Sequence, residues 1–269
     1  MSREPYIHGY ASSVLDSHSH RTVANSAAYL APHLRPGTRV LDLGCGAGTI
    51  TAGLGALVAP ARLTAVDVDP GILAVAAGNA ASEGVVNIDF QVGDAHHLEF
   101  ADDSFDVAHA HQVLQHLSDP VAALRELARV VRPDGLVAVR DADYGAFTWY
   151  PDHDGLRQWQ ALYRAVARHT GGEPDAGRHL VAWAHAAGLE DVVVTGSAWT
   201  YAQGSGVEWW AGTWSQRVVD STFARHAREA GLATQGELEE LSRAWLDWAE
   251  HPDAWFLVPH GEVLARVPG

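Results

Sequence analysis

The sequence predicts an α/β protein built on a doubly wound, mostly parallel, seven-stranded Rossmann-like sheet, with a helical N-terminal lid and a helical cap insertion. An apolar segment, residues 39–43, runs into three glycines at alternate positions, and residues 50–58 then have the composition of a helix. A strand, a glycine turn and a helix form the first half of a βαβ nucleotide-binding unit. Later apolar segments end in polar residues and alternate with helical segments, as parallel sheets require.

Composition narrows the classes of partner. The chain has 269 residues, enough for one large α/β domain or a core with a small cap. Its formal net charge of −15 would repel nucleic acid and anionic membranes, so we expect neither as a partner. One cysteine excludes an intrachain disulfide and a cysteine-based zinc site. Residues 1–9 contain no apolar run, so we expect no signal peptide and a cytoplasmic protein.

The glycine turn has the pattern D-x-G-x-G-x-G, formed by Asp42, Gly44, Gly46 and Gly48. A dinucleotide fingerprint needs a glycine or alanine where this chain has Thr49, and no lysine follows the loop as it would in a P-loop. Glycines let a ligand approach the backbone closely, whereas Asp42 would repel phosphates. The turn therefore suits a ligand with a positive end.

This acidic glycine motif resembles that of the class I S-adenosylmethionine (AdoMet)-dependent methyltransferases, most closely the ubiquinone/menaquinone-type small-molecule branch. The resemblance covers residues 38–140 by specific motifs and the rest of the chain by topology. It implies AdoMet as the cofactor, held at Asp42 and at the three glycines of the turn. It also implies methyl transfer to a small organic molecule.

Two further acidic residues match the cofactor site of that family. Asp67 ends the second predicted strand, at about the distance from the glycine turn where βαβ folds present an acid to ribose hydroxyls. Val68 is placed to cover one face of the adenine, and Asp69 is expected to cap the next helix instead. The Gly-Asp-Ala run after the third predicted strand implies that Asp94, with Ala95, meets the adenine amine.

The fourth predicted strand, residues 105–111, ends in a polar run that resembles the fourth motif of the family. His111 and Gln112 are expected beneath the methionine part of AdoMet, and His116 in the packing. His109 and His111 share one face of a strand, so a metal pair is an alternative. No acidic or cysteine ligand accompanies them, and the resembled family needs no metal for small-molecule transfer. We therefore predict no metal site.

Candidates for the acceptor site come from the N-terminal lid, from the acidic and aromatic stretch after the fifth predicted strand, and from the tryptophan-rich insertion. The candidates are His20, Asp143 and Tyr144 as catalytic groups, and Tyr10, Trp149, Tyr150, Trp210 and Trp214 as pocket walls. Each region has an alternative interpretation. The lid residues would line a solvated helix face, the stretch after the fifth predicted strand would be a turn packed with core aromatics, and the tryptophans of the insertion would only join cap to core.

The predicted organisation is a single methyltransferase domain over residues 1–269. Residues 1–36 form the lid, residues 37–200 and 253–269 the AdoMet-binding core, and residues 201–252 the cap. The sixth strand is predicted at residues 192–194, and an antiparallel seventh at 256–258, extending toward 265. The oligomeric state is left open, with a homodimer as one option.

The predicted reaction is methyl transfer from AdoMet to a small hydrophobic or aromatic acceptor, on oxygen or carbon rather than nitrogen. The sulfonium methyl is already electrophilic, so the protein mainly aligns the acceptor in a dry site, and a base matters only if the acceptor must lose a proton. One alternative is an AdoMet-binding protein that does not methylate, regulatory or cyclase-like. The other is a nicotinamide-dependent oxidoreductase, which Asp42 and Thr49 disfavour.

Overall fold

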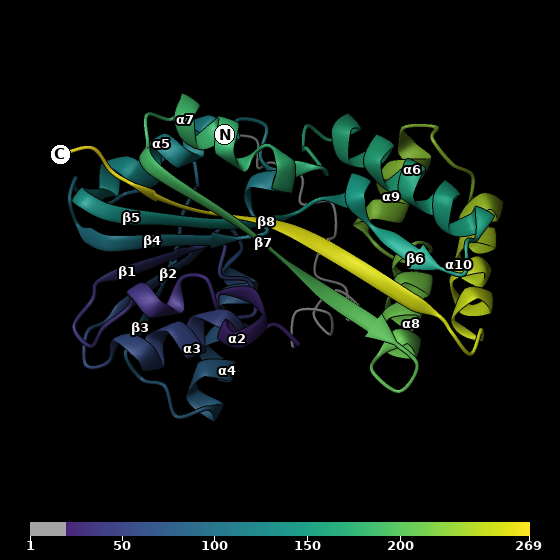
Figure 1. Cartoon of the computed structure of the whole chain (residues 1–269), viewed down its shortest axis with the longest axis horizontal. Coiled ribbons are helices and arrows are strands. Elements are labelled where there is room, and N and C mark those ends of the chain that lie inside the picture. Colours follow the sequence, from purple (N-terminus) through teal and green to yellow (C-terminus); the bar gives the residue numbers. More distant parts are fainter. Residues whose placement is uncertain (1–19) are drawn as a thin grey trace.

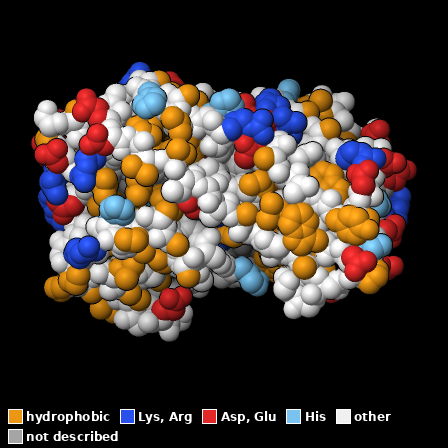
Figure 2. All heavy atoms as spheres, viewed as in Figure 1, with side chains coloured by type: hydrophobic (Ala, Val, Ile, Leu, Met, Phe, Trp, Pro, Cys, Tyr) orange, Lys and Arg blue, Asp and Glu red, His pale blue; other side chains and the backbone are white. Residues whose placement is uncertain are grey.

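The computed structural model describes residues 20–269, so the lid residues before His20, Tyr10 among them, lie outside the described residues. Figure 1 shows two lobes joined by two long strands. We call the half with helices on both faces of the sheet the sheet lobe. The other half, the helical lobe, contains α6, α8, α9 and α10. In the space-filling view, blue and red charged side chains gather at the upper part of the region where the lobes meet, and the lower part of this region is mostly white (Figure 2).

The sheet has the order β3-β2-β1-β4-β5-β8-β6, and β7 pairs with β8 on the other side. The first five strands pair in parallel, whereas β8 is antiparallel to β5, β6 and β7. The strands are β1 (Val40–Leu43), β2 (Leu63–Asp67), β3 (Ile88–Val92), β4 (Phe105–His111), β5 (Val131–Ala142), β6 (Thr148–Tyr150), β7 (Glu190–Ala202) and β8 (Trp255–Arg266). The predicted α/β fold with an antiparallel last strand is confirmed.

Two strands differ from the prediction. The sixth predicted strand, residues 192–194, is only part of β7, which spans Glu190–Ala202 and pairs with β8 along almost its whole length. A short additional strand, β6, forms in the acidic and aromatic stretch after β5, where we predicted no strand, because Thr148, Trp149 and Tyr150 pair with the first residues of β8. The sheet therefore has eight strands, since β8 extends beyond the end of β5 and offers a free edge there.

Each face of the sheet lobe is covered by helices. One face packs against α2 (Val23–Ser26), η1 (Ala31–His33), α3 (Thr49–Val58) and α4 (Pro70–Ser82). The other packs against α5 (Pro120–Val130) and α7 (Leu180–Ala186), with η2 (Leu114–His116) and η4 (Ala176–Arg178) at their ends. Asp69 accepts from the backbone N–H groups of Gly71 and Ile72, so its predicted capping role is confirmed.

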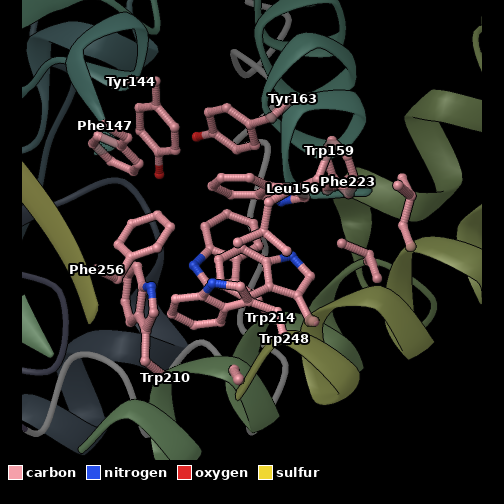
Figure 3. Packing of buried hydrophobic residues seen from close by; sticks show 14 of the residues in the cluster. Tyr144, Phe147, Leu156, Trp159, Tyr163, Trp210, Trp214, Phe223, Trp248 and Phe256 are labelled. Carbon is pink, nitrogen blue, oxygen red and sulfur yellow. The ribbon is translucent and has the colours of Figure 1, made fainter. Parts of the chain in front are cut away.

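The helical lobe has an aromatic core of its own. It is built from α6 (Asp154–His169), α8 (Val207–Arg217), α9 (Thr222–Glu229) and α10 (Gln235–Ala249), with η3 (Tyr144–Ala146) at its border. The indole of Trp159 meets those of Trp214 and Trp245 edge to face, with centroids 4.5 and 4.7 Å apart (Figure 3). Such offset geometry adds to the large apolar area that each ring buries. Helix α6, which lies outside the predicted cap, packs in this core as well.

One carboxyl group, on β5, is completely buried. Asp141, near the end of β5, has no exposed surface, and its Oδ1 accepts from the backbone N–H of Gln115 at 3.1 Å. Burial raises the pKa of Asp141 to about 8, and the hydrogen bond from Gln115 offsets this only in part. The folded protein therefore holds Asp141 as the neutral acid at neutral pH.

This burial predicts the pH dependence of stability. An unfolded aspartate loses its proton near pH 4, whereas folded Asp141 keeps it to about pH 8. Its contribution to stability is thus full below about pH 4 and is lost as the pH rises toward 8. Replacing Asp141 with Asn, a neutral isostere, should make the protein progressively more stable than wild type between about pH 5 and about pH 8.

Urea unfolding of both proteins across this pH range measures the difference. The buried histidines His111, His116 and His260 have depressed pKa values and titrate with the opposite sign, but both proteins contain them, so the difference isolates Asp141. A difference in unfolding free energy that stays constant with pH would show that Asp141 is ionised in the folded state.

Candidate functional site

The glycine turn between β1 and α3 has a backbone that side chains would disrupt. Gly44, Gly46 and Gly48 all have positive φ, at +67°, +53° and +78°. A Cβ on Gly44 would lie 2.4 Å from Val113 Cγ2, and one on Gly48 would lie 2.8 Å from Ala76 Cβ. Val113, which follows β4, and Ala76 of α4 therefore pack against the turn. The turn itself carries no side chains at its glycines, so a ligand can approach its backbone closely.

Asp67 joins this turn to the end of β2. Its Oδ2 accepts from the Gly46 N–H at 3.0 Å, and its Oδ1 accepts from the Asp69 N–H at 3.2 Å. These contacts orient the Asp67 carboxylate between the glycine turn and the start of α4. Val68, the next residue, is 41% exposed and so presents apolar surface beside the carboxylate.

Asp94 and Ala95 follow β3, the neighbouring strand. Asp67 lies in register with Val92, so Asp94 comes two residues beyond that pairing at the same edge of the sheet. The Asp94 side chain is 52% exposed, and its Oδ1 accepts from the His96 N–H at 2.9 Å. The fold thus brings the glycine turn, Asp67 and Asp94 together at the carboxyl ends of adjacent strands, where parallel sheets bind their ligands.

Asp42 has a different environment from the one we expected of a ligand contact. It is almost fully buried, its Oδ1 lies 2.8 Å from His109 Nδ1, and its Oδ2 accepts from Thr51 Oγ1 at 2.6 Å. These contacts tie β1 to β4 and to α3 below the glycine turn. The geometry favours a supporting role for Asp42, and direct contact with the cofactor stays a prediction.

The end of β4 is connected to β5 and β8. His111 Nδ1 lies 3.5 Å from Arg140 Nη1, and burial together with the Arg140 charge holds the pKa of His111 well below its usual value. Gln112 has a positive φ of 53°, donates its N–H to the Arg140 carbonyl, and places Nε2 2.9 Å from His260 Nε2. His111 and Gln112 therefore contact β5 and β8, whereas Asp67 lies at the end of β2.

A buried polar group, which we call the Arg140 cluster, occupies this side of the sheet. Arg140 Nε lies 3.2 Å from Glu262 Oε1 and 3.1 Å from Ser197 Oγ, and its Cζ lies 5.0 Å from the centre of the Trp199 ring. The cluster consists of Tyr29, His111, Arg140, Ser197, Trp199, His260 and Glu262.

The sequence analysis did not select Arg140 or Glu262. Both interrupt otherwise apolar strands, and charged residues buried in such strands are rare unless they are paired. That interruption is the signal that was available in the sequence. Burial lowers the pKa of Arg140 to about 10, which keeps the guanidinium charged at neutral pH.

The predicted catalytic residues have structural partners. Asp143 accepts from Arg178 Nε and Nη2 at 2.6 and 2.5 Å and also caps η3. Tyr144 is stacked on Tyr163 in the aromatic core, where burial raises the pKa of its phenol. His20 is exposed, with its ring 4.1 Å from that of Trp209. These positions favour structural roles for Asp143 and Tyr144, whose catalytic roles stay predictions.

The predicted pocket walls fall into two groups. Trp210 and Trp214 are buried in the helical-lobe core, where Trp210 stacks on Tyr201 at 4.6 Å. Trp149 is partly buried against Phe256, and Tyr150 is 56% exposed. Burial leaves Trp210 and Trp214 little surface to offer a ligand in this state.

Neither a metal cluster nor a spanning helix occurs in the part of the chain that the structure describes. Between residues 20 and 269, no three His, Cys, Asp or Glu side chains are grouped so that they could hold a metal ion. His109 faces Asp42, whereas His111 faces Arg140, so the two do not act as a pair. Over the same residues, no helix has the length and apolar character needed to cross a membrane.

The sheet order, the acidic glycine turn and the acids after β2 and β3 define a class I AdoMet-dependent methyltransferase. The chain belongs to the methyltransferase domain family, whose model matches residues 34–201. The predicted class and its cofactor, AdoMet, are therefore confirmed.

Related proteins match nearly the whole chain. An uncharacterized methyltransferase of Schizosaccharomyces pombe is 32% identical over 97% of this chain and 96% of its own length. A protein of Aspergillus luteorubrus named as a probable methyltransferase is 30% identical over 97% of this chain and 96% of its own. A Bacillus halodurans protein assigned as a methyltransferase shares the fold, with a TM-score of 0.60 and 18% identity over 88% of this chain and 95% of that one.

The described residues fit AdoMet. The glycine turn suits the close approach of the cofactor, the Asp67 carboxylate beside it suits a ribose diol, and the exposed Asp94 suits the adenine amine. When bound, AdoMet supplies an electrophilic methyl group on a positively charged sulfur.

The role of Asp67 can be measured directly. A carboxylate that accepts two ribose hydroxyls makes charge-assisted hydrogen bonds, so Asp67→Ala should weaken AdoMet binding by about 1.5–3 kcal/mol in titration calorimetry. Asp69→Ala is the matched control, because it removes a helix cap two residues away and should lower stability by about 1 kcal/mol while sparing affinity. Equal affinity of wild type and Asp67→Ala would remove Asp67 from the cofactor site.

Proposed function

We propose that this protein transfers the methyl group of AdoMet to a small, hydrophobic or aromatic organic acceptor, on oxygen or carbon. The observation that carries the proposal is the docking of residues 21–30 over the sheet beside the end of β4. Trp199 Nε1 donates to the Asn25 carbonyl at 2.9 Å, and the Arg21 guanidinium lies 5.5 Å from the same indole ring. Two residues of this segment, Ala27 and Leu30, are fully buried.

This arrangement supports the predicted lid. Methyl transfer needs the acceptor to be aligned with the methyl group in a site from which water is excluded. A segment held to β7 through Trp199, and to the core of the sheet lobe through Leu30, covers the region between the glycine turn and the Arg140 cluster. Closure there would separate the reaction from solvent.

The side chains at this junction favour an apolar acceptor. Trp199, Tyr201 and Trp209 are partly buried where the lobes meet, unlike the fully packed Trp214. Partly buried aromatic rings offer large, rigid surfaces to a flat ligand. We therefore assign the walls of the acceptor site to these three residues and to Trp149, with α6, α8, α9 and α10 as the cap.

The reaction itself is tested by its products. The purified chain is incubated with AdoMet and a panel of phenols, enols and matching amines, and mass spectrometry follows S-adenosylhomocysteine (AdoHcy) and the methylated acceptor. We expect AdoHcy to accumulate only with an oxygen-bearing aromatic or enolic acceptor. Tight AdoMet binding without AdoHcy for any acceptor would favour the non-methylating alternative, and binding of NADH in place of AdoMet would favour an oxidoreductase.

Substitutions of two tryptophans in α8 distinguish a residue in the wall of the acceptor site from a residue in the core of the helical lobe. Trp209→Ala should raise the KM for the acceptor about tenfold with little change in unfolding free energy, because the ring is only partly buried. Trp214→Ala should lower the unfolding free energy by about 3–5 kcal/mol, because its ring is fully buried among other aromatics. Steady-state kinetics and urea unfolding measure the two effects. An unchanged KM for Trp209→Ala would contradict the wall assignment.

A further inference from the structure

The Arg140 cluster contains four buried polar atoms that have no hydrogen-bond partner among the described residues. Three of them, Arg140 Nη2, His111 Nε2 and the Tyr29 hydroxyl, belong to residues that interact through the Arg140 guanidinium, and the fourth is His260 Nδ1. Arg140 and His111 are more than nine-tenths buried as whole residues. Buried polar atoms in folded proteins are almost always paired, so several unpaired atoms in one contiguous group point to a missing partner.

Each of the first three atoms is a hydrogen-bond donor. A guanidinium can only donate, so Arg140 Nη1 donates to His111 Nδ1, and that nitrogen must carry the lone pair. Burial and the Arg140 charge hold the pKa of His111 well below its usual value, so the ring is neutral and its one hydrogen lies on Nε2. Burial raises the pKa of Tyr29 well above its usual value, so its phenol keeps its proton.

The charges around the donors favour an oxygen over a cation. Both oxygens of the Glu262 carboxylate already accept hydrogen bonds, from Arg140 Nε, Ser197 and Thr195, and neither of them is bonded to Arg140 Nη2. The Arg140 guanidinium is the largest of the charges that act on the Tyr29 phenol. Arg140 Nη2 and His111 Nε2 can only donate, so an ammonium group would find an acceptor only at the Tyr29 hydroxyl, whereas an oxygen could accept from each of these atoms.

The position of the cluster identifies the occupant. The residues that fit adenosine, Asp67 and Asp94, follow β2 and β3, on one side of β1. His111 and Arg140 lie in register on β4 and β5, on the other side. A molecule held by the cluster therefore lies on the acceptor side of the sheet, beneath the segment that contains Tyr29.

We propose that Arg140, His111 and Tyr29 form a subsite that binds an acidic oxygen of the acceptor, a phenol, enol or carboxyl group, as its anion. The anion enters after its proton has passed to solvent, so no base within the cluster is needed. This inference rests on the proposed function, because it assigns the polar end of the same acceptor site. Glu262, Ser197 and Thr195 act as positioning residues that hold the guanidinium.

The test uses two probes that differ by one methyl group, 4-nitrophenol and 4-nitroanisole, added to the full chain with AdoHcy bound. The visible absorbance of 4-nitrophenolate reports its ionisation directly. We expect the wild type to bind 4-nitrophenol as the phenolate, to lower its apparent pKa by about one unit, and to bind it at least tenfold more tightly than 4-nitroanisole.

Variants assign the effect to the donors. Tyr29→Phe removes a hydroxyl without a described partner, so folding should tolerate it, and it should weaken 4-nitrophenol about three- to tenfold. Tyr163→Phe removes the same group from the helical-lobe core and should leave probe binding unchanged. Arg140→Gln combined with Glu262→Gln avoids an unpaired buried carboxylate and should abolish the preference for 4-nitrophenol. AdoHcy affinity should be the same in all of these proteins.

Three outcomes would overturn the proposal. One is equal wild-type affinity for the two probes, and another is wild-type affinity for 4-nitrophenol in Tyr29→Phe. The third is loss of AdoHcy affinity in the cluster variants, which would assign the donors to the carboxylate of the cofactor. Wild-type AdoHcy binding and product formation are measured separately, so their failure would contradict the proposed function and not this subsite alone.

Discussion

Strand β8 is the element on which both lobes depend, because its antiparallel ladders join β5, β6 and β7. Alternate residues of a strand point to one face, so a single strand can supply several environments in turn. Along β8, Phe256 lies in the aromatic core, His260 and Glu262 belong to the Arg140 cluster, and Leu264 packs in the sheet-lobe core. The acceptor site that we propose therefore lies where β8 passes from one core to the other.

Buried polar contacts support the site on both sides of β4. Asp42 contacts His109 and Thr51 below the glycine turn. On the other side of β4, Arg140 of β5 pairs with Glu262 of β8. Such pairs are costly to bury, and a well-packed apolar pair of similar volume is often at least as stable. Their value in this fold is therefore orientation, since they hold the surfaces that face the cofactor and the acceptor.

Much of the cofactor half was predictable from the sequence because its signals are local. The glycine turn is a pattern of seven consecutive residues, 42–48, and the acid at the end of β2 lies two residues before the Asp-Pro start of α4. Parallel strands end at one edge of the sheet, so knowing the strands was enough to bring Asp67 and Asp94 together. The class of protein, the fold and the cofactor follow from these short-range patterns.

The acceptor half was decided by tertiary structure. Arg140 and Glu262 are 122 residues apart, and only the pairing of β5 with β8 brings them together. The sequence predicted Trp214 as a pocket wall, but Trp214 packs against Trp159 in the core of the helical lobe. Asp143, a predicted catalytic residue, accepts hydrogen bonds from Arg178, 35 residues away. The sequence by itself determined the strand–turn–helix units and the chemistry of their ends. Which polar side chains face a ligand depended on contacts between distant elements, because only the folded chain shows which groups have already found a partner.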